Sequence, residues 1–187
     1  MLPEPSFPDR PLKNGEAFTV WGAGYSLRSR AARAGVEDQV ISITGFITRT
    51  NLPDAPRCAV HRAGVADPER CIAPIPAFWI GDRADAPEAE SIKVIGWASN
   101  YAQIYEAIPQ YRAGRDRIYH DLFWGVALPN PLPAAGAKVT VTGRYGSVFE
   151  RAATGAETDD VMGLLSYEKL VYLEPSKEIA TLPGLTR

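Results

Sequence analysis

The chain has 187 residues, of which 45% are hydrophobic and 22% are charged, a composition typical of one globular domain. Its 20 Lys and Arg residues nearly balance its 22 Asp and Glu residues, which excludes a general electrostatic attraction to nucleic acid. A nucleic-acid role would need a local basic patch. No apolar run approaches the ~20 residues that span a bilayer, so we expect a soluble chain without a transmembrane segment.

The two ends of the chain predict extended segments, because proline is frequent there and hydrophobic periodicity is absent. Residues 1–17 form the expected lead, and residues 175–187 the expected tail, which leaves a single domain over residues 18–174. A proline-rich lead of this kind often follows a removed export signal or lipid-anchor site. We therefore expect a periplasmic or secreted protein, with a cytoplasmic protein as the alternative.

Between the ends, short apolar segments bounded by glycine and proline predict strands. The first organised stretch, residues 18–23, leads into residues 25–33, which fit a short helix. The segment 40–47 alternates β-branched residues around Gly45, and a glycine inside a strand marks a bulge or tight bend of the kind that barrel closure requires. Further strand character recurs in four later segments, at residues 77–82, 92–97, 138–145 and 164–173.

A short amphipathic helix is expected after the third strand. Asn100 is a suitable N-cap, and apolar side chains recur at helical spacing until Pro109. The loops fall between these elements. Residues 50–76 are rich in Pro, Asp, Arg and Ala and contain both cysteines, so we expect an irregular excursion outside the core. Residues 83–90 and 150–160 are polar and are expected to be exposed.

The order of elements is strand, strand, strand, helix, strand, strand, which is the order of an OB-fold. The phrases that carry it, FTVWGA, VISITGFI, FWIGD, IKVIGW, GAKVTVTGRYG and LLSYEKLVYL, resemble those of small exported bacterial OB-fold proteins. The resemblance covers roughly residues 18–174. It implies a mainly β fold, a five-stranded OB-fold-like Greek-key barrel with one short helix between strands 3 and 4 and long loop insertions. No functional residue transfers from it.

Cys58 and Cys71 are the only cysteines, and both lie in the 50–76 loop. The simplest role is a disulfide that ties this loop, which would stabilise it by ~3 kcal/mol in the chain-entropy model and would indicate an oxidising compartment. The alternatives are a metal site formed by Cys58, His61 and Cys71, or two unrelated thiols. The spacing that attaches haem is absent, and no other cofactor is expected.

Aromatic residues are concentrated in the central strands and helix. On an OB barrel the face of the second and third strands is the usual ligand platform, where flat rings stack on bases or sugars. The alternative is that these rings fill the barrel and pack the helix against it. Seven residues are the tentative ligand-binding set: Trp79, Trp97, Tyr101, Tyr105, Trp124, Arg144 and Tyr145.

Two other patterns, a group of arginines and a His–Asp pair, are less specific for a function. A small basic cluster, Arg28, Arg30 and Arg33, with Arg49 farther along, is interpreted as a solvated surface rather than a nucleic-acid contact. His120 and Asp121 are neighbours that could pair as a base and its orienting carboxylate, but no nucleophile motif accompanies them. No catalytic residue is therefore assigned, and the chain is not expected to be an enzyme.

Two hypotheses follow. The first is a non-enzymatic, exported binding or assembly module that docks to a protein, glycan or other component of the cell envelope. The second is an intracellular OB-fold protein that binds single-stranded nucleic acid through the aromatic residues with Arg28, Arg30 and Arg144. The first predicts a formed disulfide, whereas the second predicts reduced thiols and binding that weakens steeply with salt.

Overall fold

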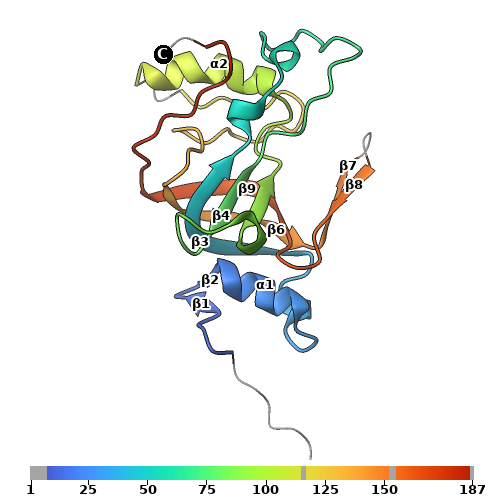
Figure 1. Ribbon diagram of the computed structural model, residues 1–187, viewed down its shortest axis with the longest axis vertical. Helices are drawn as coiled ribbons and strands as arrows, with labels where there is room; N and C mark the ends of the chain where they lie inside the picture. The colour runs from blue at the N-terminus through green and yellow to red at the C-terminus, as the bar shows by residue number, and fades with distance from the viewer. Residues whose placement is uncertain (1–7, 115–116, 152–154, 186–187) are drawn as a thin grey trace, which may run out of the picture.

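The computed structural model describes residues 8–114, 117–151 and 155–185 (Figure 1). Five strands form a closed barrel, and the expected mainly β fold is confirmed. The barrel strands are β3 (Gln39–Thr50), β4 (Phe78–Gly81), β5 (Ile92–Ile95), β6 (Lys138–Gly146) and β9 (Leu164–Glu174).

The strand pairing gives the barrel its closure. Neighbouring strands follow the order β3, β4, β5, β9 and β6, and β6 pairs again with β3. All of these pairs are antiparallel except β5 with β9, which is parallel. The helix α2 (Tyr101–Arg112) lies between the third and fourth barrel strands in sequence. This is the strand order that the OB-fold resemblance implied.

The alternation in β3 explains its place in the wall. Ile43 and Ile47 are buried, while Ser42 and Thr44 on the opposite face hydrogen-bond to hydroxyl groups of β6 at 2.7 and 2.8 Å. A Cβ atom on Gly45 would lie 2.7 Å from the carbonyl oxygen of Gly81. Glycine at this position therefore lets β3 pack closely against β4. The irregularity expected at Gly45 lies farther along the strand, because the pairing register with β4 shifts between Ile47 and Arg49.

The sheet begins earlier than residue 18. The short strands β1 (Lys13–Asn14) and β2 (Ala17–Thr19) pair with each other, and β2 pairs in parallel with β3. The helix α1 (Val20–Arg28) follows directly and lies beneath the barrel in Figure 1. It therefore starts before residue 25, where the sequence suggested helix. A Cβ atom on Gly22 would lie 2.0 Å from the carbonyl oxygen of Leu12, so a glycine is needed where α1 touches this segment.

The first turn of α1 is capped from two directions. The Thr19 hydroxyl oxygen accepts a hydrogen bond from the amide of Gly22 at 2.8 Å. The two carboxylate oxygens of Asp82, at the end of β4, accept from the amides of Val20 and Trp21 at 2.9 and 2.8 Å. A carboxylate at a helix N-terminus also interacts favourably with the helix dipole. Asp82 therefore attaches α1 to the barrel.

At the other end of the barrel, α2 covers the core (Figure 1). Asn100 caps it through the amide of Gln103, as expected. The helix does not stop at Pro109 but continues to Arg112. Proline removes one intrahelical donor, and the last turn is held by Tyr111, whose ring packs edge-on against Tyr119 with the centroids 5.7 Å apart.

The remaining segments are short. Four single-turn helices lie at Arg33–Gly35, Leu52–Asp54, Arg57–Ala59 and Glu88–Glu90. The loop between β6 and β9, which we expected to be polar and exposed, contains a hairpin of β7 (Val148–Arg151) and β8 (Gly155–Thr158). The expected tail packs back onto the domain, because Leu182 is buried and the Ser176 hydroxyl donates to the carbonyl of Ala135. No helix in the described ranges is long and apolar enough to cross a membrane.

Replacing Asp82 with alanine should lower the free energy of unfolding by about 1–2 kcal/mol, because two amides of α1 would lose a charged acceptor. Denaturant unfolding measures this value. Asp85→Ala is the control, since Asp85 is 86% exposed and pairs with Arg83 at the surface, and it should change the stability much less. Equal losses in the two variants would contradict the capping role.

Candidate functional site

The outer face of β4 and β5 is the position at which an OB barrel usually binds its ligand. Trp79 and Ile95 lie on this face and form, with Ala77, a small hydrophobic cluster separate from the main core. Phe149 of the β7–β8 hairpin packs against the same cluster. As a result Trp79 is only 7% exposed, and its ring offers little surface on which a base or sugar could stack.

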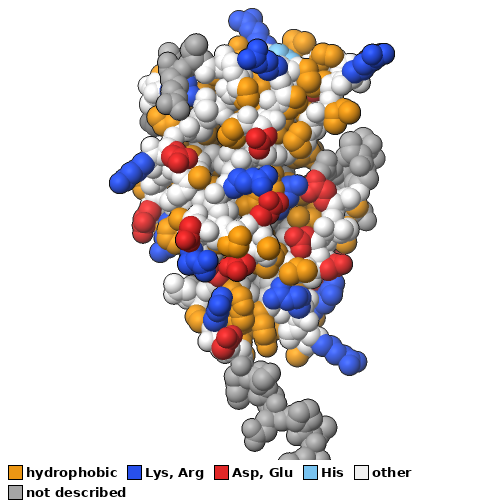
Figure 2. Space-filling view, in the orientation of Figure 1, with side chains coloured by type: hydrophobic (Ala, Val, Ile, Leu, Met, Phe, Trp, Pro, Cys, Tyr) orange, Lys and Arg blue, Asp and Glu red, His pale blue; other side chains and the backbone are white. Residues whose placement is uncertain are grey.

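The cations at this face are paired. The Arg49 guanidinium lies 4.3 Å from the centre of the Trp79 ring and the Lys93 amine 5.6 Å from it. Arg49 forms an ion pair with Glu88 at 2.6 Å, and Lys93 forms one with Glu157 of β8 at 2.8 Å. Charges of both signs are interspersed across the middle of the molecule in Figure 2. The face is therefore covered by the chain itself and is close to neutral.

Three of the rings in the predicted ligand-binding set are buried. Trp97, Tyr101 and Tyr145 are each 0% exposed and belong to the main core. Trp97 packs against Phe78 with the ring centroids 6.2 Å apart, and the Tyr145 hydroxyl donates to the carbonyl of Met162. Burial raises the pKa of Tyr101 to about 12, so its hydroxyl stays neutral. These three residues therefore pack in the main core, which is the alternative given for them in the sequence analysis.

The other predicted residues are dispersed. Tyr105 is partly buried against the core, and the exposed Arg144 donates to the carbonyl of Asp38 at 2.7 Å. Trp124 is 43% exposed, but it lies in the loop that follows α2. The seven predicted residues therefore do not form one platform.

Arg28 and Arg33 of the basic cluster contact other parts of the chain, and Arg30 is exposed. Arg28 donates to the carbonyl of Val161, and Arg33 pairs with Glu37 at 3.3 Å. Arg49 lies on β3 and pairs with Glu88. These contacts agree with the interpretation of a solvated surface.

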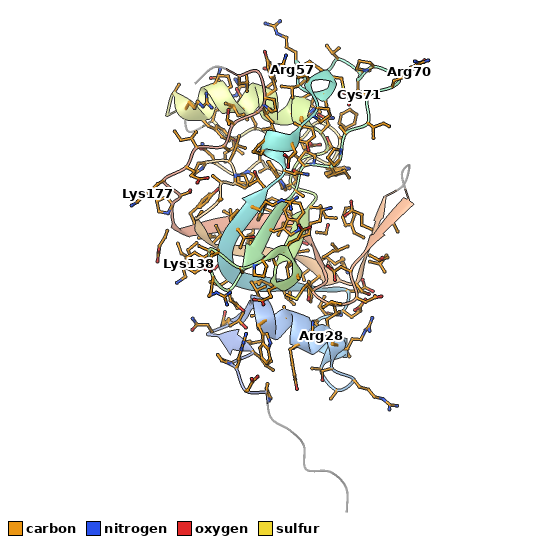
Figure 3. All side chains as sticks on the ribbon, viewed as in Figure 1. Arg28, Arg57, Arg70, Cys71, Lys138 and Lys177 are labelled. Atoms are coloured by element: carbon orange, nitrogen blue, oxygen red, sulfur yellow. A yellow bond between two sulfur atoms is a disulfide. The ribbon has the colours of Figure 1, made fainter. Side chains whose placement is uncertain are left out.

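The loop between β3 and β4 contains the expected disulfide. Cys58 and Cys71 are bonded, with their Cα atoms 5.8 Å apart, and the loop lies beside the α2 end of the molecule (Figure 3). Both sulfur atoms are used in this bond, so they do not join His61 as metal ligands. Within the described ranges no group of three His, Cys, Asp or Glu side chains is arranged to hold a metal ion.

His61 reinforces the same loop. Its Nδ1 lies 2.9 Å from the carbonyl oxygen of Arg62, and its Nε2 lies 2.7 Å from a carboxylate oxygen of Asp67. Only the protonated ring can donate from both nitrogens. The bond to the Arg62 carbonyl, followed by the bond to Asp67, raises the pKa of His61 above its ordinary value of 6.5.

An NMR titration should therefore place the pKa of His61 above 6.5, and Asp67→Asn should lower it. Because the folded pKa is raised, this contact stabilises the loop fully below the unfolded pKa and is lost as the pH rises through the folded pKa. Amide protection in the loop should fall as the pH rises above the ordinary value of 6.5 and through the raised pKa of His61. A titration at or below the ordinary value would contradict this interpretation.

A groove lies at the α2 end of the barrel, and sequence reasoning did not find it. It has two adjoining parts with volumes of about 790 and 450 Å³. Residues shared by both parts include Arg112, Ala134 and Ile179. Its walls come from the end of α2, from residues 131–135 and from the C-terminal segment, so only the folded chain brings them together.

The groove has an apolar floor and a charged rim. Ile108, Leu132 and Ile179 are its aliphatic residues. Ile179 is 71% exposed, whereas Ile108 and Leu132 are 2 and 6% exposed and form a nearly buried floor. Two tyrosine rings join them. The Tyr172 hydroxyl donates to the carbonyl of Pro131 at 2.5 Å and the Tyr111 hydroxyl to that of Leu128 at 3.4 Å. Burial raises the pKa of both tyrosines, which keeps them neutral.

The rim carries the charge of the groove. Away from β3, the charged residues that line the groove are Arg112, Lys177 and Glu178. The first two are cationic, and Glu178 is a carboxylate. Figure 3 shows Lys177 at the edge of the molecule below α2, where it points outward. The groove can therefore accept an apolar segment and place an anionic group at its rim. Asp121, the neighbour of His120, accepts hydrogen bonds from the backbone amides of Ser99, Phe123 and Trp124.

Comparisons with known proteins identify no family. No family model and no curated protein matches the sequence. Among solved structures the chain is similar to one described as a "putative aspartyl-tRNA synthetase" from Leishmania major Friedlin, with 12% identity and a TM-score of 0.39. The alignment covers 98% of this chain and 24% of that one. At this identity and TM-score the likeness carries no argument about function.

Proposed function

We propose that this chain is a non-enzymatic, exported binding module that docks a segment of a partner protein of the cell envelope. The observation that carries the proposal is the groove at the α2 end, with its aliphatic floor and its cationic rim. A polypeptide with apolar side chains and an acidic residue matches both features. A glycan matches them less well, because the hydroxyls of the two rings that line the groove, Tyr111 and Tyr172, already donate to the carbonyls of Leu128 and Pro131.

Two further observations support this choice over the alternative of single-stranded nucleic acid. The ring on the usual OB platform, Trp79, is covered, and the cations beside it are paired with Glu88 and Glu157. Nucleic-acid binding needs cations that are available to phosphates. The Cys58–Cys71 bond supports an oxidising compartment such as the periplasm or the extracellular space.

Export predicts that Cys58 and Cys71 are bonded in living cells. Alkylation of acid-quenched cells without reductant, followed by mass measurement, should leave both cysteines unlabelled, and prior reduction should label both. Two labelled thiols without reductant would contradict export and favour the cytoplasmic alternative.

Site-specific photo-crosslinking tests the groove. A photoreactive phenylalanine analogue placed at Ile179 should give one discrete adduct with an envelope protein in cells that naturally make the chain. The matched control is the same analogue at Leu173, which is 51% exposed on β9 and does not line the groove, and it should give none.

The charge of the rim provides the second part of this test. Lys177→Glu should reduce the adduct at position 179 by at least about tenfold, since it would repel an acidic segment. Adducts of equal yield at positions 179 and 173 would contradict the proposal. So would tight, salt-sensitive binding of a labelled single-stranded oligonucleotide by the purified protein.

A further inference from the structure

A loop after α2 exposes an unusual amount of hydrophobic surface. We name residues 118–125 the apolar loop. Its side chains Ile118, Leu122, Phe123 and Trp124 are 56, 69, 72 and 43% exposed. Single exposed hydrophobic residues are common, but several large ones grouped together mark an interaction site. The apolar loop does not line the groove.

A buried carboxylate holds the apolar loop in this conformation. Asp121 is 1% exposed, and its two oxygens accept hydrogen bonds from the amide and hydroxyl of Ser99 at 2.6 and 2.7 Å. They also accept from the amides of Phe123 and Trp124 at 2.9 and 2.8 Å. The hydrophobic side chains are therefore displayed by a fixed backbone, and their exposure is not the result of an unstructured chain.

Two more contacts fix the loop to the rest of the molecule. The side-chain oxygen of Gln103, on α2, accepts from the amide of Leu122 at 3.1 Å. At the base of the loop His120 and Ala127 form an antiparallel bridge, and Gly125 has a φ of +67° that a larger residue would rarely adopt. These contacts fix the backbone of the apolar loop and attach it to α2, so that the loop forms an ordered tip.

Among the described residues, the exposed arginines that flank this tip in the sequence are cationic. Arg117 is exposed and lies 5.4 Å from the centre of the Tyr119 ring, and Arg112 ends α2. Among the described residues from 112 to 128, Asp121 is the only carboxylate, and it is buried. The two residues outside the described ranges, Arg115 and Asp116, have opposite charges.

We propose that the apolar loop inserts into the surface of an anionic lipid bilayer. Leu, Phe and Trp partition into the interfacial region, where Trp is especially favoured, and neighbouring Arg residues are attracted to anionic headgroups. A protein interface usually buries about 800 Å² and roughly 20–30 residues on each partner, whereas the apolar loop presents four large hydrophobic side chains. A bilayer surface accepts such a tip without a complementary pocket. This inference goes beyond the proposed function and does not depend on the groove.

Vesicle co-sedimentation of the whole chain tests the proposal. The wild-type protein should pellet with phosphatidylcholine vesicles that contain about a third phosphatidylglycerol, and high salt should weaken the binding. The double variant Leu122→Ser/Phe123→Ser should bind at least about tenfold more weakly. The matched control Val171→Ser/Leu173→Ser removes two side chains on β9 that are 53 and 51% exposed, and it should bind like the wild type.

Tryptophan fluorescence supplies a second readout. Trp79 and Trp97 are buried, and Trp21 is half-buried against Tyr25. In a Trp21→Phe variant the emission of Trp124 should therefore shift to shorter wavelength on binding and should be quenched by brominated lipid. Circular dichroism must show that each variant is folded.

The proposal is overturned if the wild-type protein stays in the supernatant, or if the β9 control loses binding as much as the loop variant does. It is also overturned if vesicles fail to bind while a photoreactive residue at position 123 forms an adduct with a protein. Failure of the crosslink at position 179 would affect the groove alone, so the two proposals fail separately.

Discussion

The structure depends on the position of β3, which hydrogen-bonds to β4 along one edge and to β6 along the other. These pairings join residues that are far apart in sequence, and together with the parallel pair of β5 and β9 they close the sheet. A closed barrel has no free strand edges in its wall. Its interior is filled by alternate residues of every strand, and α1 and α2 cover opposite ends (Figure 1).

Closure decides where the chain can bind other molecules. The interior is full, and the outer face of β4 and β5 is covered by Phe149 and by the ion pairs of Arg49 and Lys93. Two surfaces lie at the α2 end, where the C-terminal segment and the residues after α2 meet the helix. The groove and the apolar loop are both built there, on supports that hydrogen bonds hold in place.

The barrel was predictable because its signals are local. The alternation around Gly45 and in residues 138–145 identifies strands that face a core on one side, and Asn100 followed by helical spacing identifies α2. The disulfide was predictable because the two cysteines share one irregular loop. The start of α1 was not, because part of its cap is Asp82, which is distant in sequence. The hairpin of β7 and β8 is short and polar and leaves little periodic signal.

The binding surfaces were harder to predict for the same reason. An aromatic residue in a strand can point inward or outward, and Trp97 and Tyr145 point into the core while Trp79 is covered from outside. The groove needs the C-terminal segment, whose sequence resembles a free tail. The exposure of Leu122 and Phe123 depends on the bonds that Asp121 makes to Ser99, and nothing in the local pattern distinguishes them from core residues.

Hydroxyl-radical footprinting of the tryptophan residues tests most directly whether the platform is closed and the α2 end is exposed. Trp124 should be oxidised rapidly, and Trp79 and Trp97 should be protected until the protein unfolds. Oxidation of Trp79 at the rate of Trp124 in the folded protein would show that the outer face of β4 and β5 is accessible, and it would contradict the account.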